Sequence, residues 1–424
     1  MSTTNDQDQY HQWAKLSTVD EIALGDSLHS YIYRVPKKLR AIGEDKYEPC
    51  VVSIGPYHRD KRNLEVTENH KKLYLKSFVS RSTTPNYTLT TMVNKVREVQ
   101  DNASKCYDGK IFLSEEDFIR MLILDGCFIL ELLFRYQLKE QDELDAEDIL
   151  FNKRWIIPSL RRDLVLLENQ IPFDILVCLF QLTLNPIGMF SLNNLIETFF
   201  DPILPTIQST NIDFALEGKH LLDLLRNYLI QTPGNISVKV GENPMWEHTI
   251  SAVDLQEGGV KFRGKSCNSG LLDITFSDGI FEIPPFFFGD SWTVLFPNMI
   301  ALEQGRADYS EEITSYAILM DNLINSEKDV KLLRNEGIIM GSSKEDETIA
   351  YVVNNLCKEA FYENFHYDGL CYRVNEYRKK PRNRWRANFK RRYVHTPWVG
   401  VSIAAAVVLL MLTFAQTVIS ILQV

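Results

Sequence analysis

The stretch RMLILDGCFILELLF, residues 120–134, decides the fold class because it is apolar on nearly every side of a helix. Ser114 stands before it as a suitable N-cap, and three acidic residues follow in the first turn, where they complement the helix dipole. A helix without a polar face has to be covered by other elements. We therefore expect residues 114–141 to form the central helix of a mainly α-helical fold.

The segments before this helix carry mixed signals. Residues 24–39 have helix-like spacing, whereas residues 50–58, CVVSIGPYH, are a β-branched run ended by Gly-Pro, which indicates a strand and then a turn. Residues 64–80 return to helical spacing. The polar residues 82–110 are expected to contain a loop.

Further helices are expected after the central one. Pro158 suits the first position of a helix over residues 158–169, and Pro172 ends it before another helix begins. A helix is also expected over residues 216–230, and the chain is helical again near its end, most plainly over residues 345–361.

Only residues 260–296 have clear β character. LLDITF and IFEIPPF alternate around Ser277-Asp278-Gly279, which is a hairpin signal. The expected fold class is therefore mainly α with a small antiparallel β region and a C-terminal single transmembrane helix. The expected organisation is a polar N-terminal tail (1–23), a helical lobe (24–230), a connector (231–245), a second lobe with a β-hairpin and helices (246–377), a basic juxtamembrane collar (378–398) and a transmembrane helix (399–424).

Charge is distributed unevenly along the 424 residues. Nine basic and no acidic residues lie between Arg378 and Arg392, and removing these nine from the 46 in the chain leaves 37 basic residues against 56 acidic ones. Such an acidic body is a poor general binder of nucleic acid, because phosphate backbones need a cationic surface. The seven cysteines are scattered and form no C-x-x-C pair, which is typical of a reducing compartment.

The C-terminal segment Val399–Val424 has 26 residues without a charge, and a membrane crossing needs about 20 apolar residues. Basic residues just before it predict a cytosolic body, with the plasma membrane as the expected location. A buried helix of a soluble core is disfavoured by the length and the collar. A glycolipid anchor is disfavoured because the N-terminus lacks an entry signal. The residues expected to orient the segment are Arg378, Lys379, Lys380, Arg382, Arg384, Arg386, Lys390, Arg391, Arg392 and Trp398.

Residues 259–266, GVKFRGKS, match the G-x-x-x-x-G-K-S pattern of phosphate-binding loops. Such a loop needs a strand before the glycines and a helix directly after the lysine. Here a helix is expected before Gly258-Gly259, a strand inside the pattern, and a turn and a strand after Lys265. The pattern is therefore interpreted as a helix end, a strand and a cationic turn.

Other chemical motifs are weak. Cys50, His58 and His70 match no metal-site spacing, and no nucleophile has a base nearby in sequence. The polar groups of LLENQIPF and NMIALEQ, namely Glu168, Asn169, Gln170, Glu303 and Gln304, are interpreted as helix caps or members of a core network rather than as catalytic groups. No catalytic residue, metal or cofactor is therefore expected.

Three N-glycosylation sequons begin at Asn86, Asn102 and Asn235, in segments expected to be loop or polar. They matter only if the body lies outside the cytosol.

Several motifs together resemble a plant-specific family catalogued as domain of unknown function 247. They are IYRVPKKLR (32–40), VVSIGPYH (51–58), DGCFILELL (125–133), DLVLLENQIPF (163–173), GVKF (259–262), LLDITFSDGIFEIPP (271–285) and NMIALEQ (298–304). The resemblance covers about residues 24–424, and TENHKK (67–72) departs from the methionine–glutamate pair expected before its histidine. It implies a single-pass plant membrane protein with a mostly helical body and no established enzymatic activity. Some grass members are implicated in self-incompatibility as recognition determinants.

The expected function is therefore that of a non-enzymatic, membrane-anchored plant protein in protein–protein recognition or signalling, and the resemblance includes self-incompatibility-like recognition among the expected settings. Its expected partners are the membrane and a protein not identified by the sequence, with no nucleic acid and no small-molecule substrate. The alternative is a nucleotide-binding hydrolase that uses residues 259–266, and a purely structural tether is a third hypothesis.

Overall fold

The computed structural model describes residues 30–41, 43–81, 85–141, 148, 150–183, 190–204, 218–231, 249–265, 270–341, 344–380 and 397–422. Its first elements are helical: α2 (Lys37–Arg40), α3 (Glu65–Ser80), α4 (Pro85–Lys105), α5 (Glu115–Glu140), α6 (Ile156–Asp163), α7 (Phe173–Thr183), α8 (Leu192–Phe200) and α9 (Leu221–Gln231), with short 3₁₀ turns at Glu44–Lys46, Arg62–Leu64 and Asp201–Ile203.

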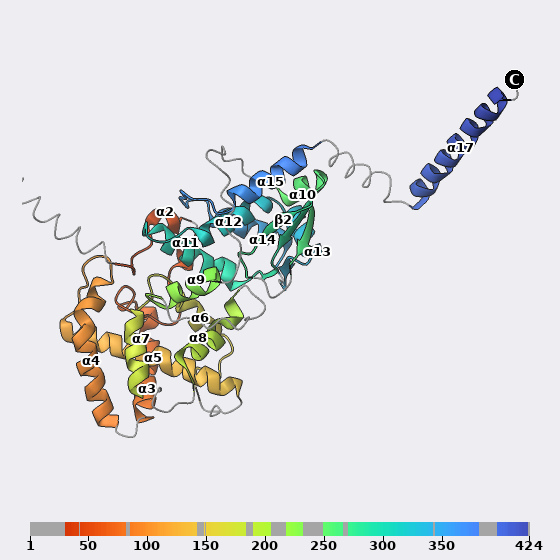
Figure 1. Cartoon of the computed structure of the whole chain (residues 1–424). Coiled ribbons are helices and arrows are strands. Elements are labelled where there is room, and N and C mark those ends of the chain that lie inside the picture. The colour runs from red at the N-terminus through yellow and green to blue at the C-terminus, as the bar shows by residue number, and fades with distance from the viewer. Residues whose placement is uncertain are drawn as a thin grey trace, which may run out of the picture.

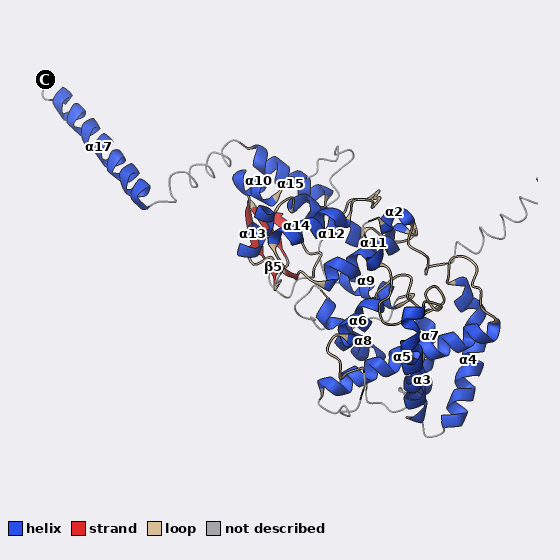
Figure 2. Cartoon of the chain, turned by 180° about the vertical axis from the view of Figure 1, so that it is seen from behind, coloured by secondary structure: helices blue, strands red, loops and turns tan. Residues whose placement is uncertain are grey.

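Strands occur among the later elements. These are α10 (Ala252–Glu257), β1 (Lys261–Gly264), β2 (Thr275–Ser277), β3 (Ile280–Ile283), β4 (Phe286–Phe287), a π-helical turn (Ser291–Leu295), α11 (Phe296–Gln304), α12 (Glu312–Leu323), α13 (Glu327–Asn335), β5 (Ile339–Met340), α14 (Asp346–Leu356), α15 (Asp368–Lys379) and α17 (Pro397–Leu422). Figure 2 shows the strands gathered at the end of the body that holds α10, α13 and α14.

Helix α5 is the central helix that the sequence predicts. The Ser114 hydroxyl accepts a hydrogen bond from the Asp117 N–H at 3.2 Å, which confirms the N-cap. Helices α3, α4, α7 and α8 pack around α5 (Figure 1). A Cβ at Gly126 would lie 2.5 Å from a Leu179 methyl, so the glycine allows α7 to approach closely.

Two segments on either side of α5 differ from their predictions. The polar segment predicted to contain a loop forms α4, because Met92, Val96 and Ala103 recur at helical spacing and are buried. Helix α6 begins at Ile156, so Pro158 is its third residue, where the missing N–H still has no intrahelical partner.

The β-hairpin is confirmed, but the sheet is not purely antiparallel. Strand β2 pairs antiparallel with β3, and the turn between them has positive φ at Asp278 (50°) and Gly279 (78°). Strand β1 pairs parallel with β3, and β4 pairs parallel with β5. The predicted small antiparallel region is therefore a mixed three-stranded sheet and a parallel pair.

The predicted C-terminal transmembrane helix is corrected. Residues Val399–Val424 were expected to cross a membrane, and the structure forms α17 there. Within the described residues, no helix has both the length and the apolar character that a membrane crossing requires. The transmembrane part of the predicted fold class is therefore not supported.

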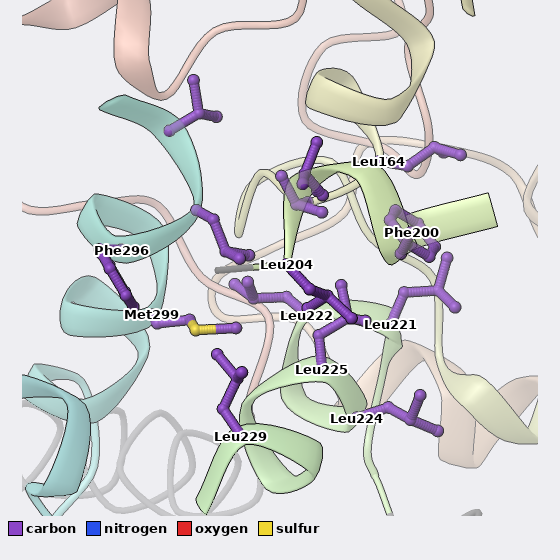
Figure 3. Packing of buried hydrophobic residues seen from close by; sticks show 14 of the residues in the cluster. Leu164, Phe200, Leu204, Leu221, Leu222, Leu224, Leu225, Leu229, Phe296 and Met299 are labelled. Carbon is purple, nitrogen blue, oxygen red and sulfur yellow. The ribbon is translucent and has the colours of Figure 1, made fainter. Parts of the chain in front are cut away.

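One hydrophobic core runs through the body, from Ile32 to Val374. Figure 3 shows its middle, where Leu204 and the α9 leucines Leu222 and Leu225 lie between Phe200 on one side and Met299 of α11 on the other. The predicted connector, residues 231–245, lies outside the described residues except for Gln231.

Candidate functional site

Residues 50–58 form an irregular segment with no strand, and its middle, from Val52 to Gly55, is buried. The buried Asp163 carboxylate at the end of α6 accepts hydrogen bonds from the backbone N–H groups of Cys50, Val51 and Val52, at 2.9, 2.6 and 2.9 Å. These amides therefore bond to a side chain where a strand would bond to a neighbouring strand. Burial raises the pKa of Asp163, and the three amide bonds oppose that rise.

The side-chain amides of Asn169 and Gln170 form further buried hydrogen bonds to the backbone, and together with those of Asp163 they make a network. Asn169 accepts from the Ile54 N–H at 2.7 Å and donates to the Val52 carbonyl at 3.0 Å. Gln170 donates to the carbonyls of Leu164 and Leu166 at 2.8 and 2.9 Å. Both side chains are buried and bonded to the backbone, which agrees with the predicted core network.

Glu168 links the same network to the segment before α2. Its carboxylate accepts from the Val35 N–H at 2.6 Å and from Arg40 at 2.5 Å, and it lies 3.3 Å from His58 Nε2. Burial alone would raise the pKa of Glu168, but His58, Val35 and Arg40 outweigh it, and the pKa lies below its usual value.

A buried ion pair completes the network. Lys71 on α3 lies 2.6 Å from the Asp125 carboxylate on α5, which also accepts from the Gly55 N–H at 2.9 Å. Burial raises the pKa of Asp125, and the Lys71 ammonium opposes that rise. Within the described residues, no group of three or more histidine, cysteine or acidic side chains is placed to hold a metal ion. His58 contacts Glu168, and Cys50 Sγ accepts from Arg162 at 2.8 Å.

Up to Lys265 the phosphate-loop pattern has the local structure that its context predicts, and the predicted turn at residues 266–269 lies outside the described residues. Gly259 ends α10 with a φ of 96°, and β1 occupies the middle of the pattern. The Lys265 ammonium lies 2.5 Å from the Asp273 carboxylate and 3.0 Å from the Asp273 carbonyl. The pattern thus places its lysine against a carboxylate of the same loop, while nucleotide binding itself remains a hypothesis.

Glu303 and Gln304, at the end of α11, have different roles. Glu303 is buried, pairs with Arg226 at 2.8 Å and accepts from the N–H of Thr314 at 2.8 Å. Gln304 points the other way, to the loop that follows α14. Its side chain accepts from the Phe361 N–H at 2.7 Å and donates to the Phe361 carbonyl at 2.5 Å.

Two more side chains hold this loop, residues 357–367, which we call the aromatic loop. The Glu311 carboxylate accepts from the N–H groups of Glu363 and Asn364, at 3.0 and 2.7 Å. Ser315 donates to the Asn364 carbonyl and accepts from the His366 N–H, both at 3.2 Å. The backbone of the loop is therefore bonded, between Phe361 and His366, to side chains of α11, of α12 and of the residue before α12.

The aromatic rings of the loop point in opposite directions. Phe365 and Tyr367 are buried, and the Tyr367 hydroxyl donates to the Leu272 carbonyl at 3.0 Å. Phe361 is 76% exposed although both of its backbone polar groups are bonded to Gln304. The arrangement presents one large apolar side chain to solvent on a backbone that Gln304 of α11 holds in place.

The aromatic loop was not predicted from the sequence. Residues 345–361 were expected to be one helix, but α14 ends at Leu356. The run FYENFHY, residues 361–367, carries no signal that separates it from a helix, because Phe361 and Phe365 are four positions apart, as on one helix face. The pairing of Gln304 with Phe361 joins residues far apart in sequence and has no local signal.

Few of the predicted membrane-orienting and glycosylation residues are described in full. Arg378 is packed against Gly258, and Lys379 pairs with Glu376 at 3.3 Å. Lys380 is exposed just after α15. The residues of this set that lie outside the described part are Arg382, Arg384, Arg386, Lys390, Arg391, Arg392 and Asn235.

The remaining three residues of these predictions lie on helices. Trp398 is in α17 and Asn86 in α4, although the structure describes neither side chain. Asn102 is an exposed residue of α4 rather than of a loop.

Comparisons with known proteins identify the same plant family that the sequence motifs resemble. A family model described as a plant protein of unknown function, DUF247, matches residues 32–412. The UPF0481 protein At3g47200 of Arabidopsis thaliana is 31% identical, over 92% of this chain and 86% of its own length. A second Arabidopsis thaliana UPF0481 protein, At3g02645, is 23% identical over 91% of this chain and 89% of its own. No solved structure matches the chain. The chain belongs to the DUF247 family of plant proteins.

Proposed function

We propose that the chain acts in protein–protein recognition, with Phe361 as a central residue that a partner protein binds. The observation that carries the proposal is the 76% exposure of Phe361 on a backbone bonded to Gln304. Burying a fully exposed phenylalanine contributes about 1.5–3 kcal/mol, so Phe361 offers a large gain to a partner that covers it.

The fixed backbone strengthens this argument. Ordering a loop during association costs free energy, about 0.5–1.5 kcal/mol for each side chain that is immobilised. Bonds from Gln304, Glu311 and Ser315 order the aromatic loop before any partner binds. Aromatic side chains in such positions commonly supply much of the binding energy of an interface.

The other parts of the expected function stay predictions. They are the absence of enzymatic activity, signalling or self-incompatibility-like recognition, and a cytosolic body at the plasma membrane. The contacts of the aromatic loop support recognition in general and do not distinguish among these settings.

Site-specific photocrosslinking tests the proposal. The full chain carrying p-benzoylphenylalanine at position 361 is expressed in plant cells and irradiated. The matched control carries the same residue at position 351, because Tyr351 on α14 is 69% exposed. We expect a protein adduct from position 361 that position 351 does not form. No protein adduct, or the same adducts from both positions, would contradict the proposal.

A further inference from the structure

We infer that the protein that binds Phe361 binds Phe112 at the same time, through a second apolar pocket on its folded surface. This inference rests on the proposed function and adds a second contact point and the kind of partner. It starts from residues 108–113, which lie between α4 and α5 and which we call the α4–α5 loop. Within the described residues, Phe112 of this loop is the most exposed large apolar side chain, at 87%. The Lys110 ammonium lies 5.8 Å from the centre of this ring and covers little of it.

The α4–α5 loop directs its side chains as the aromatic loop does. Ile111 and Leu113 are half-buried and pack against the core, whereas Phe112 between them lies in solvent. In the aromatic loop, Phe365 is buried and Phe361 is exposed. Both loops thus dock on the body through neighbouring apolar residues and leave one phenylalanine ring exposed to another surface.

Backbone bonds order the α4–α5 loop. The Asp108 N–H donates to the Ile32 carbonyl at 2.8 Å, and the Tyr57 hydroxyl donates to the Asp108 carbonyl, also at 2.8 Å. At the other end of the loop, Ser114 caps α5. Phe112 therefore protrudes from a backbone that is ordered before any partner binds.

Two adjacent residues tie this loop to the aromatic loop. Ile32 accepts the bond from the α4–α5 loop, and the hydroxyl of the next residue, Tyr33, donates to the Leu302 carbonyl of α11 at 2.8 Å. Two residues further along α11, Gln304 bonds the backbone of Phe361. Helix α2, which follows in the chain, lies next to α11 in both views of the body (Figures 1 and 2). One bonded framework therefore carries both loops and fixes the separation of their backbones.

This framework selects a folded partner. Because both rings protrude, the partner has to supply two apolar pockets, and the separation of these pockets has to match that of the two loops. A folded surface holds two pockets at a set separation before binding, whereas a flexible segment loses conformational freedom when it is ordered. Once one ring is bound, the other is held near its own pocket, so the two contacts strengthen each other. The partner is therefore a folded protein that contacts both loops in one interface.

The test measures whether the two contacts are coupled. The full chain carries p-benzoylphenylalanine at position 112, and its adduct yield is measured in dilute plant extract with and without Phe361→Ala. Tyr351→Ala is the matched control, because Tyr351 on α14 is 69% exposed. We expect Phe361→Ala to lower the yield about tenfold and Tyr351→Ala to leave it unchanged, since burial of one phenylalanine ring corresponds to at least that difference in affinity.

The reciprocal experiment places p-benzoylphenylalanine at position 361 and removes the other ring by Phe112→Ala. We expect a loss of yield of the same size. Mass spectrometry of the adducts from both positions should identify one protein, crosslinked through two segments that are separate in its sequence. Urea denaturation checks that each variant remains folded, because truncation of an exposed ring should leave stability nearly unchanged.

The outcomes separate the two proposals. If position 361 forms no protein adduct, the proposed function and this inference are both wrong. If position 361 forms an adduct but position 112 captures no protein or a different one, only the inference is overturned and recognition by Phe361 stands. A yield at position 112 that Phe361→Ala leaves unchanged, or that Tyr351→Ala lowers equally, also overturns the inference. Capture of both positions by one short segment of the partner does the same.

Discussion

The segment 50–58 and the aromatic loop 357–367 are both irregular backbone, and both are held by side chains from other parts of the chain. Asp163 and Asn169 bond the amides of the first, whereas Gln304 and Glu311 bond those of the second. The segment turns its apolar side chains, such as Val52 and Ile54, into the core. The loop turns Phe361 outward.

The difference shows that hydrogen bonds from side chains to irregular backbone have different effects in the core and at the surface. Inside the core, these bonds satisfy the backbone of a segment that has no partner strand. Losing them leaves backbone N–H groups unpaired in an apolar interior. At the surface, water can replace the lost bonds, so they order the loop but add little to the free energy of unfolding. Changes in the first region should therefore affect folding, and changes in the second should affect presentation of Phe361.

The largest expected effect comes from Asp163→Ala. The change removes the acceptor of the N–H groups of residues 50–52, of which Val52 is buried and Val51 half-buried, and each unpaired buried N–H costs about 1–3 kcal/mol. We expect the free energy of unfolding to fall by about 3–5 kcal/mol, measured by urea denaturation. Asp163→Asn, which keeps one acceptor oxygen, should lose less. A loss under about 1 kcal/mol for the alanine variant would show that the amides find other partners.

Gly55→Ala should have the next largest effect. Gly55 has a φ of 73°, and an added Cβ would lie 2.5 Å from the Gln170 carbonyl oxygen. Backbone strain and this clash together should cost about 2–4 kcal/mol. Gly109→Ala is the matched control, because φ there is 81° and nothing lies within 4 Å of the added Cβ. It should cost about 1 kcal/mol, and equal losses in both variants would refute the close contact.

The sequence predicts elements whose signals are local. The central helix with its Ser114 cap, the hairpin at Asp278-Gly279 and the helix end at Gly259 all depend on residues within a few positions of one another. The predicted core role of LLENQ is also confirmed, because a polar run within apolar surroundings has to be bonded.

Features that depend on distant pairs were missed. Residues 50–58 have β-branched composition, but a strand also needs a partner strand, and Asp163 supplies the bonds instead. The parallel pairing of β1 with β3 joins segments that no turn connects. The aromatic loop depends on Gln304, which lies 57 residues before Phe361. The C-terminal transmembrane prediction used the length and apolar composition of residues 399–424, the basic residues before them and the family resemblance, and the described helices do not support it.

Asp321 on α12 can be compared with Asp163. Burial raises the pKa of both carboxylates, but backbone N–H bonds oppose the rise only at Asp163. Burial raises the pKa of Asp321 from 3.8 to about 6. The neutral form is therefore favoured in the folded state, and stability is lost as pH rises from about 4 through about 6.

Asp321→Asn removes this pH dependence. The difference between the two pKa values corresponds to at most about 3 kcal/mol, and partial exposure reduces the expected effect to about 1–2 kcal/mol. The variant should be more stable than the wild type at pH 7–8 and equal to it near pH 4, measured by urea denaturation across that range. A constant difference at every pH would mean that packing, not ionisation, is responsible.

The smallest effect on stability is expected in the aromatic loop, where the effect on local order should be clear. Gln304→Ala removes both bonds to the Phe361 backbone, and Phe361→Ala removes only an exposed ring. We expect the free energy of unfolding to fall by about 1 kcal/mol or less for Gln304→Ala and by under about 0.5 kcal/mol for Phe361→Ala.

Because a protease needs its target segment locally released, chymotrypsin should cleave after Phe361 about tenfold faster in Gln304→Ala than in the wild type. Peptide mapping measures this rate, and Gln256→Ala, at an exposed position of α10, is the matched control. Equal cleavage rates in the wild type and both variants would mean that the loop is ordered by Phe365 and Tyr367 alone. Phe361 would then need no support from α11 to face a partner.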